Sequence, residues 1–292
     1  MATSATFEER RWTSHDGLSL YARDYAAKGD EVGLPVICLH GLTRNSKDFD
    51  EIAPLVAQMG RRVIVADVRG RGQSGRDPNP ANYQPKTYAR DVIGMMKELG
   101  IDRAVFLGTS MGGIITMTLA AIRPRAVAAA ILNDVGPEIA PEGIARILSY
   151  AGQPVEIRNW DDAAAYVQMT NAVAFPHYRK GNWQKMARRT FRDQGGVPVL
   201  DYDPAISVAL AKPPPRLAGW IARLLFRRLA RRRPTLLIRG ALSDVISADI
   251  AEKMQRMAPT LRRVDVPDVG HAPTLTEPEA VDAIRNFLRT VP

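Results

Sequence analysis

Short apolar runs alternate with amphipathic segments along most of the chain. Continuous apolar runs lie at residues 36–39, 63–66, 104–107, 127–132 and 235–238. Such short unbroken runs are typical of strands that are buried on both faces of a parallel sheet. Segments with helical spacing separate them, at residues 47–59, 86–99, 111–122, 247–257 and 277–288. This alternation predicts a doubly wound α/β fold.

Three further strands complete the predicted sheet. Residues 13–25 hold two partly alternating runs on either side of Asp16-Gly17, which predicts an antiparallel hairpin ahead of the parallel strands. Residues 261–266 supply a last strand. We therefore expect a mostly parallel sheet of eight strands.

The alternation of strands and helices stops between residues 133 and 235. The intervening residues read as helices and loops, with helical patterns at 159–170 and 217–233 and a loop at Gly195-Gly196. A chain of this length can form one catalytic unit that carries an insertion. The sequence predicts an α/β core formed by residues 1–137 and 234–292, with a helical cap at residues 138–233 inserted between the sixth and seventh strands.

The composition is that of a folded globular protein. Of the 292 residues, 46% are hydrophobic and 24% are charged, unlike disordered chains of low hydrophobicity. The chain start lacks an apolar leader, and no apolar run approaches the roughly 18 residues that a transmembrane helix needs. The single cysteine, Cys38, lies in an apolar run and excludes an intramolecular disulfide. We expect a cytoplasmic protein without a transmembrane segment.

The positive charge is concentrated in one part of the chain. The formal net charge is +9, and residues 138–234 hold 16 basic against 8 acidic residues. This segment contains an arginine cluster beside apolar residues, at Arg223, Arg227, Arg228, Arg231, Arg232 and Arg233. Three interpretations stay open: a solvated helix face, attraction of an anionic substrate or product, and contact with an acidic membrane or partner. A nucleic-acid partner is not expected, because no recognised binding motif is present.

One short motif indicates a nucleophile. Gly108-Thr109-Ser110-Met111-Gly112 follows an apolar run and precedes a helical pattern. A serine on such a strand-to-helix turn has strained backbone angles, and the flanking glycines leave room where a Cβ atom would clash. Ser110 is the candidate nucleophile. The alternative interpretation is a small-residue turn that only joins a strand to a helix.

A serine hydroxyl needs a neutral imidazole to take its proton and a carboxylate to orient that imidazole. Among the four histidines, only His271 lies in a loop after the last predicted strand, so His271 is the candidate base. Asp244 and Asp134 each follow an apolar run, where an open α/β sheet gathers its active-site groups. Asp244 is the favoured acid, and Asp134 stays open as its rival. Their structural alternatives are a helix cap for Asp244 and a turn former for Asp134.

Acyl transfer also requires hydrogen-bond donors for the oxyanion that develops on the substrate. Two backbone amides are candidates. Met111 directly follows the candidate nucleophile, and Leu42 lies in His40-Gly41-Leu42 after an apolar run. A plain turn is the alternative interpretation of His40-Gly41.

Taken together, these motifs resemble the α/β-hydrolase superfamily from Phe7 to the C-terminus, in order as well as in type. The segment His40-Gly41-Leu42 is similar to the oxyanion loop of that family. Residues 67–74 are similar to its turn after the fourth strand, which implies that Asp67 and Arg69 hold this turn. The resemblance implies a serine esterase or a lipase-like enzyme with a helical cap, without a metal and without a cofactor.

The order Ser110, Asp244, His271 also matches the family's order of nucleophile, acid and base. Haloalkane dehalogenases and epoxide hydrolases of this fold use an aspartate nucleophile, so Ser110 argues against both. Carbon–carbon bond hydrolases usually have asparagine before the serine and tryptophan after the histidine. Thr109 and Ala272 occupy these positions here, which disfavours that activity.

The expected function is hydrolysis of a carboxylic ester, including a lactone, through an acyl-enzyme. The expected substrate is a small ester with an apolar acyl or alcohol group. Carbon–carbon bond hydrolysis, acyl transfer and ligand binding without turnover are the alternatives. The physiological substrate, its acyl-chain length, the role of the basic segment and the formation of a homodimer stay open. Candidate substrate-binding residues in the cap, each of which could equally be a core residue, are Trp160, Met169, Phe175 and Trp183.

Overall fold

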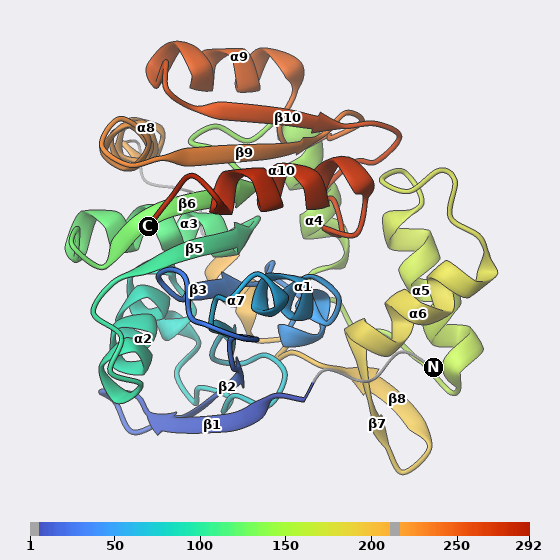
Figure 1. Cartoon of the computed structure of the whole chain (residues 1–292). Helices are drawn as coiled ribbons and strands as arrows, with labels where there is room; N and C mark the ends of the chain where they lie inside the picture. Colours follow the sequence, from blue (N-terminus) through green and yellow to red (C-terminus); the bar gives the residue numbers. More distant parts are fainter. Residues whose placement is uncertain (1–5, 211–216) are drawn as a thin grey trace.

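The predicted strands form one eight-stranded sheet in the computed structural model (Figure 1). The structure describes residues 6–210 and 217–292. The strand order is β1-β2-β4-β3-β5-β6-β9-β10. Strand β2 pairs antiparallel with β1 and β4, and all the other neighbours in this sheet run parallel. The predicted eight-stranded, mostly parallel α/β sheet is therefore confirmed.

The strands of this sheet are β1 (Glu8–Thr13), β2 (Ser19–Tyr25), β3 (Val36–Leu39), β4 (Val63–Asp67), β5 (Ala104–Thr109), β6 (Val127–Asn133), β9 (Thr235–Gly240) and β10 (Arg262–Val266). A separate antiparallel pair consists of β7 (Phe191–Gln194) and β8 (Val197–Leu200). The helices are α1 (Ile52–Gln58), α2 (Pro85–Glu98), α3 (Met111–Ile122), α4 (Pro141–Tyr150), α5 (Trp160–Asn171), α6 (Lys180–Thr190), α7 (Ile206–Leu210), α8 (Ala218–Ala230), α9 (Ala248–Met257) and α10 (Pro278–Leu288). Short 3-10 helices lie at η1 (Ser46–Phe49) and η2 (Pro80–Asn82). Among the described residues, no helix is both long and apolar enough to cross a membrane.

Each central strand sends its side chains alternately into two cores. Along β5, Ala104 and Phe106 face one core, whereas Val105 and Leu107 face the other, and all four are fully buried. Helices α2, α3, α8 and α9 contribute to the first core, and α1 and α10 contribute to the second. Burial on both faces explains why these strands are continuous apolar runs in the sequence.

The order of the strands reverses at β3. Strand β4 lies on one side of β3 and β5 lies on the other, so the connections after β3 and β5 leave the sheet in different directions. Ligand sites of open α/β sheets form at the carboxyl ends of the strands beside such a reversal. His40-Gly41 follows β3 and Ser110 follows β5. The topology thus brings these two candidate segments to one place.

The insertion between β6 and β9 differs in two ways from the predicted helical cap. Its chain forms α4 to α8, but residues 191–200 form the β7–β8 hairpin, in which Gly195 and Gly196 have positive φ and make the turn. Helix α8 packs against α3, with Phe226 and Leu229 fully buried in the first core. Within the described part of the insertion, α8 therefore belongs to the helical layer of the sheet.

Polar contacts tie the end of the hairpin to the turn after β4. The amide of Gly72 donates to the carbonyl of Asp201 at 2.9 Å, and the amide of Asp203 donates to the carbonyl of Gly70 at 2.7 Å. The side chain of Asn45 donates to the carboxylate of Asp201 at 3.1 Å. This part of the insertion is therefore anchored to the sheet at the carboxyl ends of β3 and β4.

The buried guanidinium of Arg69 joins three segments of the core. It donates two bonds of 2.6 Å to Asp91 on α2 and bonds of 2.8 and 3.0 Å to Asp16 in the first hairpin. It also donates to Asp77. Arg69 is fully buried, and the carboxylates of Asp77 and Asp91 are nearly so. The cation therefore compensates several acids that could not otherwise be buried together.

We predict that Arg69→Met lowers the free energy of unfolding by about 3–5 kcal/mol, because it leaves buried carboxylates without their cation. Urea unfolding measures the loss. The matched control is Arg90→Met on the exposed face of α2, which should change stability by no more than about 0.5 kcal/mol. A loss for Arg69→Met as small as that of the control would contradict this role.

Candidate active site

Ser110 lies on a sharp turn between β5 and α3. Its φ is 51° and its ψ is −115°, angles that an L-residue adopts only under constraint. The turn depends on close backbone contacts at its two glycines. A Cβ atom on Gly108 would lie 2.4 Å from the carbonyl carbon of Gly112, and one on Gly112 would lie 2.0 Å from the carbonyl oxygen of Leu39. Both glycines are therefore required on steric grounds, and the turn exposes the serine at the carboxyl edge of the sheet.

A chain of hydrogen bonds joins Ser110, His271 and Asp134. The Nε2 atom of His271 lies 3.0 Å from Oγ of Ser110, and its Nδ1 atom lies 2.8 Å from Oδ2 of Asp134. A carboxylate only accepts hydrogen bonds, so Nδ1 carries a proton, and in the neutral imidazole the Nε2 lone pair then faces the hydroxyl. This arrangement can take the proton of the serine hydroxyl.

The carboxylate of Asp134 is completely buried at the end of β6. Besides His271, it accepts hydrogen bonds from the amide of Gly240 at 3.0 Å and from the hydroxyl of Ser243 at 2.6 Å. Its backbone φ of 53° lies in the left-handed region, which Asp tolerates better than most residues. Three donors from separate segments therefore hold this carboxylate in one orientation.

The prediction that Asp244 orients His271 is wrong in this structure, and the rival Asp134 holds that position. Asp244 instead accepts hydrogen bonds from Nε and Nη2 of Arg146 on α4, at 2.5 and 2.8 Å. Burial of the Asp244 carboxyl would raise its pKa, but pairing with Arg146 outweighs this effect and lowers the pKa. Asp244 therefore binds the insertion to the loop after β9.

The two predicted oxyanion donors lie beside Ser110. Met111 is the first residue of α3, where a backbone N–H has no acceptor within the helix. Leu42 follows Gly41, on which a Cβ atom would lie 3.8 Å from Cβ of Ser110. The carbonyl of Leu42 accepts a 2.9 Å hydrogen bond from Nε of Arg71, which fixes the peptide plane after Leu42. Both residues therefore lie next to the serine turn, and their role as oxyanion donors stays a prediction.

His40 stabilises the loop that carries Leu42. Its Nδ1 atom donates to the carbonyl of Gly41 at 2.8 Å, and its Nε2 atom accepts from the amide of Val68 at 3.0 Å. The side chain is completely buried, and this burial lowers the pKa of His40 to about 4. A neutral imidazole is the only form that can accept from Val68 through Nε2 while donating through Nδ1.

Asn133 is a site residue that sequence reasoning missed. Its side-chain amide donates to Oγ1 of Thr109 at 3.1 Å and to the carbonyl of Pro273 at 2.8 Å. Its backbone carbonyl accepts from the amide of Ser110 at 3.0 Å. Asn133 thus connects the serine turn to the histidine loop. The available signal was its place at the end of an apolar run, directly before Asp134.

A cavity of about 190 Å³ opens beside Ser110 and His271. The insertion supplies much of its wall, from α4, α5, α6, β8 and the loops beside them, including Ile147, Tyr150, Tyr166, Phe175, Tyr178 and Tyr202. Burial raises the pKa of Tyr150 and of Tyr166, so both remain neutral hydrogen-bond donors. This part of the lining is rich in aromatic side chains, and its tyrosines contribute hydroxyl groups.

Charged pairs line another part of the cavity. The guanidinium of Arg44 binds the carboxylate of Asp48 at 2.5–3.1 Å. Lys185 lies 2.8 Å from the carboxylate of Glu51, which Arg189 also contacts. Burial would raise the pKa of Glu51, but the two cations outweigh burial and lower it. This part of the wall is polar, and its three cations are in contact with two carboxylates.

Of the four cap residues predicted to bind substrate, Phe175 lies in the described cavity wall and the other three do not. Trp183 is buried and contacts the rings of Phe175 and Tyr178. Trp160 packs under the guanidinium of Arg188, 3.6 Å from its ring centroid. The side chain of Met169 is 73% exposed. These three residues therefore have packing or surface positions away from the cavity wall.

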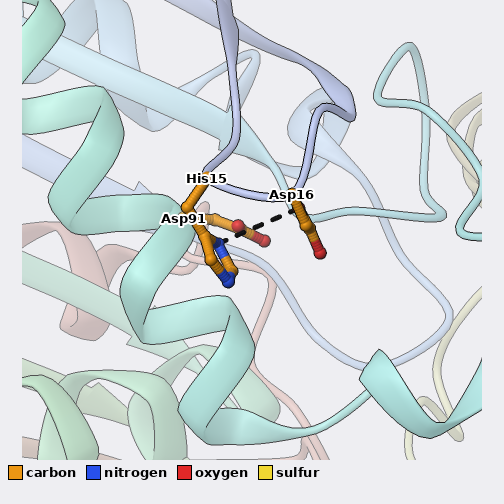
Figure 2. A group of neighbouring side chains, drawn as sticks. All are labelled: His15, Asp16 and Asp91. Carbon is orange, nitrogen blue, oxygen red and sulfur yellow. Dashed lines mark ion pairs between the residues drawn. The ribbon is translucent and has the colours of Figure 1, made fainter.

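A second group of titratable side chains lies around Arg69, in the turn after β4. Figure 2 shows His15, Asp16 and Asp91, whose nearest ligand atoms all lie within 4.8 Å of one another. Both carboxylates already accept two hydrogen bonds from Arg69. Pairing with Arg69 lowers the pKa of Asp16, whereas burial raises that of Asp91. The contacts of this group are those of a structural ion-pair network.

The burial of His40 predicts a loss of stability in acid. Its folded-state pKa of about 4 lies below the ordinary value of 6.5, so only the unfolded chain binds this proton between those two pH values. The free energy of unfolding therefore falls as the pH drops from 6.5 to 4, by up to about 3 kcal/mol.

Replacing His40 by Gln should remove this part of the pH dependence, as measured by urea unfolding across that range. The control His177→Gln replaces an exposed histidine and should keep the wild-type profile. Parallel profiles for the wild type and His40→Gln would exclude the effect.

The chain matches known proteins over most of its length. A family profile described as alpha/beta hydrolase fold matches residues 35–278. A 3-hydroxybutyrate-oligomer hydrolase from Cupriavidus necator is 33% identical over 92% of this chain and 93% of its own. A 2-(acetamidomethylene)succinate hydrolase from Mesorhizobium japonicum is 28% identical over 87% of each chain.

A solved structure is more similar still. The crystal structure of an α/β hydrolase from Novosphingobium aromaticivorans has 41% sequence identity and a TM-score of 0.89, and the match covers 98% of this chain and 99% of that one. The extent of the family match, the similarity of these relatives and the strand order lead to one conclusion. The chain belongs to the α/β-hydrolase family.

Proposed function

We propose that the protein is a serine hydrolase that cleaves carboxylic esters through an acyl-enzyme. The observation that carries this proposal is the position of His271 between Ser110 and Asp134. Serine, neutral imidazole and buried carboxylate are then in hydrogen-bond order for nucleophilic catalysis.

In the first half of the reaction, Oγ of Ser110 attacks the ester carbonyl carbon while Nε2 of His271 takes the hydroxyl proton. The amides of Leu42 and Met111 donate to the oxyanion of the tetrahedral intermediate. Asp134 stabilises the imidazolium through Nδ1. The carbon–oxygen bond to the leaving group then breaks, and Nε2 gives its proton to the departing alcohol.

In the second half, His271 takes a proton from water, and the resulting hydroxide adds to the acyl carbon. The tetrahedral intermediate collapses, the bond to Oγ breaks, and Nε2 returns the proton to Ser110. The carboxylic acid leaves. The only co-reactant is water, and the enzyme is restored.

The substrate class that we propose is a short oligoester of a small hydroxyacid. Its first support is the 33% identity, over nearly the full length of both chains, to a protein named 3-hydroxybutyrate-oligomer hydrolase. Its second support is the cavity of about 190 Å³, which is smaller than the roughly 300–1,000 Å³ usual for drug-sized ligands. A short acyl unit fits such a space better than a long fatty acyl chain. The hydroxyl groups and ion pairs of the wall suit the repeated carbonyls of an oligoester.

Three other activities of the fold are separated by their products. A carbon–carbon bond hydrolase would cleave a ketone substrate, and an acyltransferase would yield an acylated alcohol or amine. A ligand-binding protein would show no repeated turnover. Unlike these, an ester hydrolase releases acid and alcohol in equal amounts over many turnovers.

We predict that Ser110→Ala lowers kcat for ester hydrolysis by about 10⁶-fold and abolishes labelling by a fluorophosphonate probe. The readouts are acid release from 3-hydroxybutyrate dimer and trimer, from chromogenic esters of graded acyl length, and from lactones. The matched control is Ser149→Ala, at an exposed serine on α4. Undiminished turnover by folded Ser110→Ala would refute the mechanism. Faster cleavage of long-chain esters or lactones than of the oligomers would refute the substrate class alone.

A second prediction distinguishes the roles of Asp134 and Asp244 in catalysis. Asp134→Asn should lower kcat by about 10⁴-fold, because an amide cannot hold the imidazole in the required tautomer. Asp244→Asn loses only charge pairing with Arg146, so kcat should stay within about tenfold of the wild type. Steady-state kinetics on one soluble ester compares both variants. The reverse ranking of the two variants would assign the orienting role to Asp244.

A further inference from the structure

Helix α8 presents an exposed apolar surface although its opposite face is buried in the core. The side chains of Leu217 and Trp220 are each 64% exposed, and those of Ile221 and Leu224 are 44% and 49% exposed. These residues follow one another along the first half of the helix. Exposed apolar residues are ordinary when scattered, but a contiguous group on one helix face indicates an interaction surface.

Arginines continue the same face along the second half of the helix. With about 100° of rotation per residue, seven exposed side chains fall within an arc of about 120°. They are Leu217, Trp220, Ile221, Leu224, Arg227, Arg228 and Arg231. We call this set the α8 face.

Next to the α8 face is a groove of about 470 Å³ between α8 and α9. Its charged wall consists of Arg223, Arg227, Arg231, Lys253 and Arg256, with Glu138 as the one acid among the described lining residues. Glu138 is shared between Lys253 at 3.1 Å and Arg223 at 3.4 Å. The groove therefore keeps a strong positive excess. Figure 1 shows α8 and α9 together at the β9–β10 end of the sheet.

We propose that the α8 face docks the protein onto an anionic phospholipid bilayer. Trp220, Leu224 and their apolar neighbours enter the boundary between headgroups and acyl chains. The arginines of α8, with those of the adjoining groove, bind lipid phosphates.

Two properties of the α8 face, taken together, favour an anionic bilayer as its partner. Guanidinium groups bind phosphate through paired, charge-assisted hydrogen bonds. Tryptophan is enriched at the interface between a bilayer and water, and a helix with arginines beside Trp and Leu binds there in the plane of the membrane. An anionic small molecule would need the cations but would leave the apolar half of the face uncovered.

Charge argues against a second copy of the chain as the occupant. A twofold contact through this face would bring the same surface of both copies together. Helix α8 carries no acidic residue, so the arginines of one copy would meet no carboxylate on the α8 face of the other and would lose water without compensation. An anionic surface instead compensates every one of these cations.

The α8 face is separate from the proposed ester site. The described wall of the cavity beside Ser110 comes from α4, α5, α6, β8 and core loops, whereas α8 packs on α3. Exposed residues of α8 can therefore be replaced without changing the cavity. The proposal does not depend on which ester the protein cleaves.

The first experiment is co-sedimentation of the full chain with vesicles. Vesicles of phosphatidylcholine mixed with phosphatidylglycerol should bind at least about tenfold more protein than vesicles of phosphatidylcholine alone, and added salt should weaken this binding. Tryptophan emission should shift to shorter wavelength on binding. This shift should be lost in Trp220→Phe, which keeps the other three tryptophans.

Matched variants distinguish the effect of the α8 face on vesicle binding from the effect of the protein's net charge. The double variant Arg227→Glu/Arg228→Glu should lower binding to anionic vesicles by at least about tenfold. The control Arg90→Glu/Arg192→Glu makes the same change in net charge at exposed positions on α2 and β7, and should bind like the wild type. Leu224→Ser should weaken binding, whereas Val32→Ser, at a more exposed valine in a loop, should not. Circular dichroism and thermal unfolding check that each variant is folded.

Equal binding of the wild type to neutral and anionic vesicles would overturn the proposal, and so would equal losses in the arginine variant and its charge control. An unchanged emission spectrum on binding would also overturn it. Light scattering provides the remaining test. A wild-type dimer that Leu224→Ser converts to a monomer would assign the α8 face to self-association instead.

Discussion

The buried carboxylate of Asp134 is the constraint on which the geometry of the site depends. A carboxylate without water must receive hydrogen bonds from the protein, and here the donors come from Gly240, Ser243 and His271. These residues lie at the end of β9, in the following loop and in the loop after β10. The hydrogen bonds to the buried carboxylate of Asp134 therefore bring three segments together and point the imidazole of His271 at Ser110. Stability and proposed chemistry rest on the same contacts.

The insertion is held to this centre by contacts that take no direct part in the proposed reaction. Arg146 on α4 binds Asp244, and the amide of Gly270, beside His271, donates to the carbonyl of Ala174 at 2.7 Å. Residues 201–203 bind the turn after β4. The cavity wall is thus attached to the sheet at several separate points. Substitutions in its lining can therefore change the cavity while the serine turn, the histidine loop and the end of β6 keep their geometry.

The positive charge of the insertion has more than one structural role. Arg146 and Arg189 are paired with acids close to the cavity, where the neighbouring carboxylates compensate them. The arginines of the α8 face project outward beside exposed apolar side chains. Net charge alone could not distinguish these situations, because pairing depends on which side chains the fold brings together.

The sequence by itself determined the sheet, most helices, the serine turn and the histidine, because these depend on local patterns: burial on both strand faces, helical periodicity and steric limits at Gly108 and Gly112. Only the tertiary structure decided between Asp134 and Asp244. Strands β6 and β9 are parallel neighbours, so both acids start from the same edge of the sheet. Which of the two carboxylates contacts the imidazole depends on the direction of the backbone after each strand. It also depends on Arg146, which binds Asp244 and lies 98 residues from it along the chain. The residues of the cavity wall could not be predicted from the sequence either. Helical periodicity shows which face of a helix is buried, but not which part of the protein packs against that face.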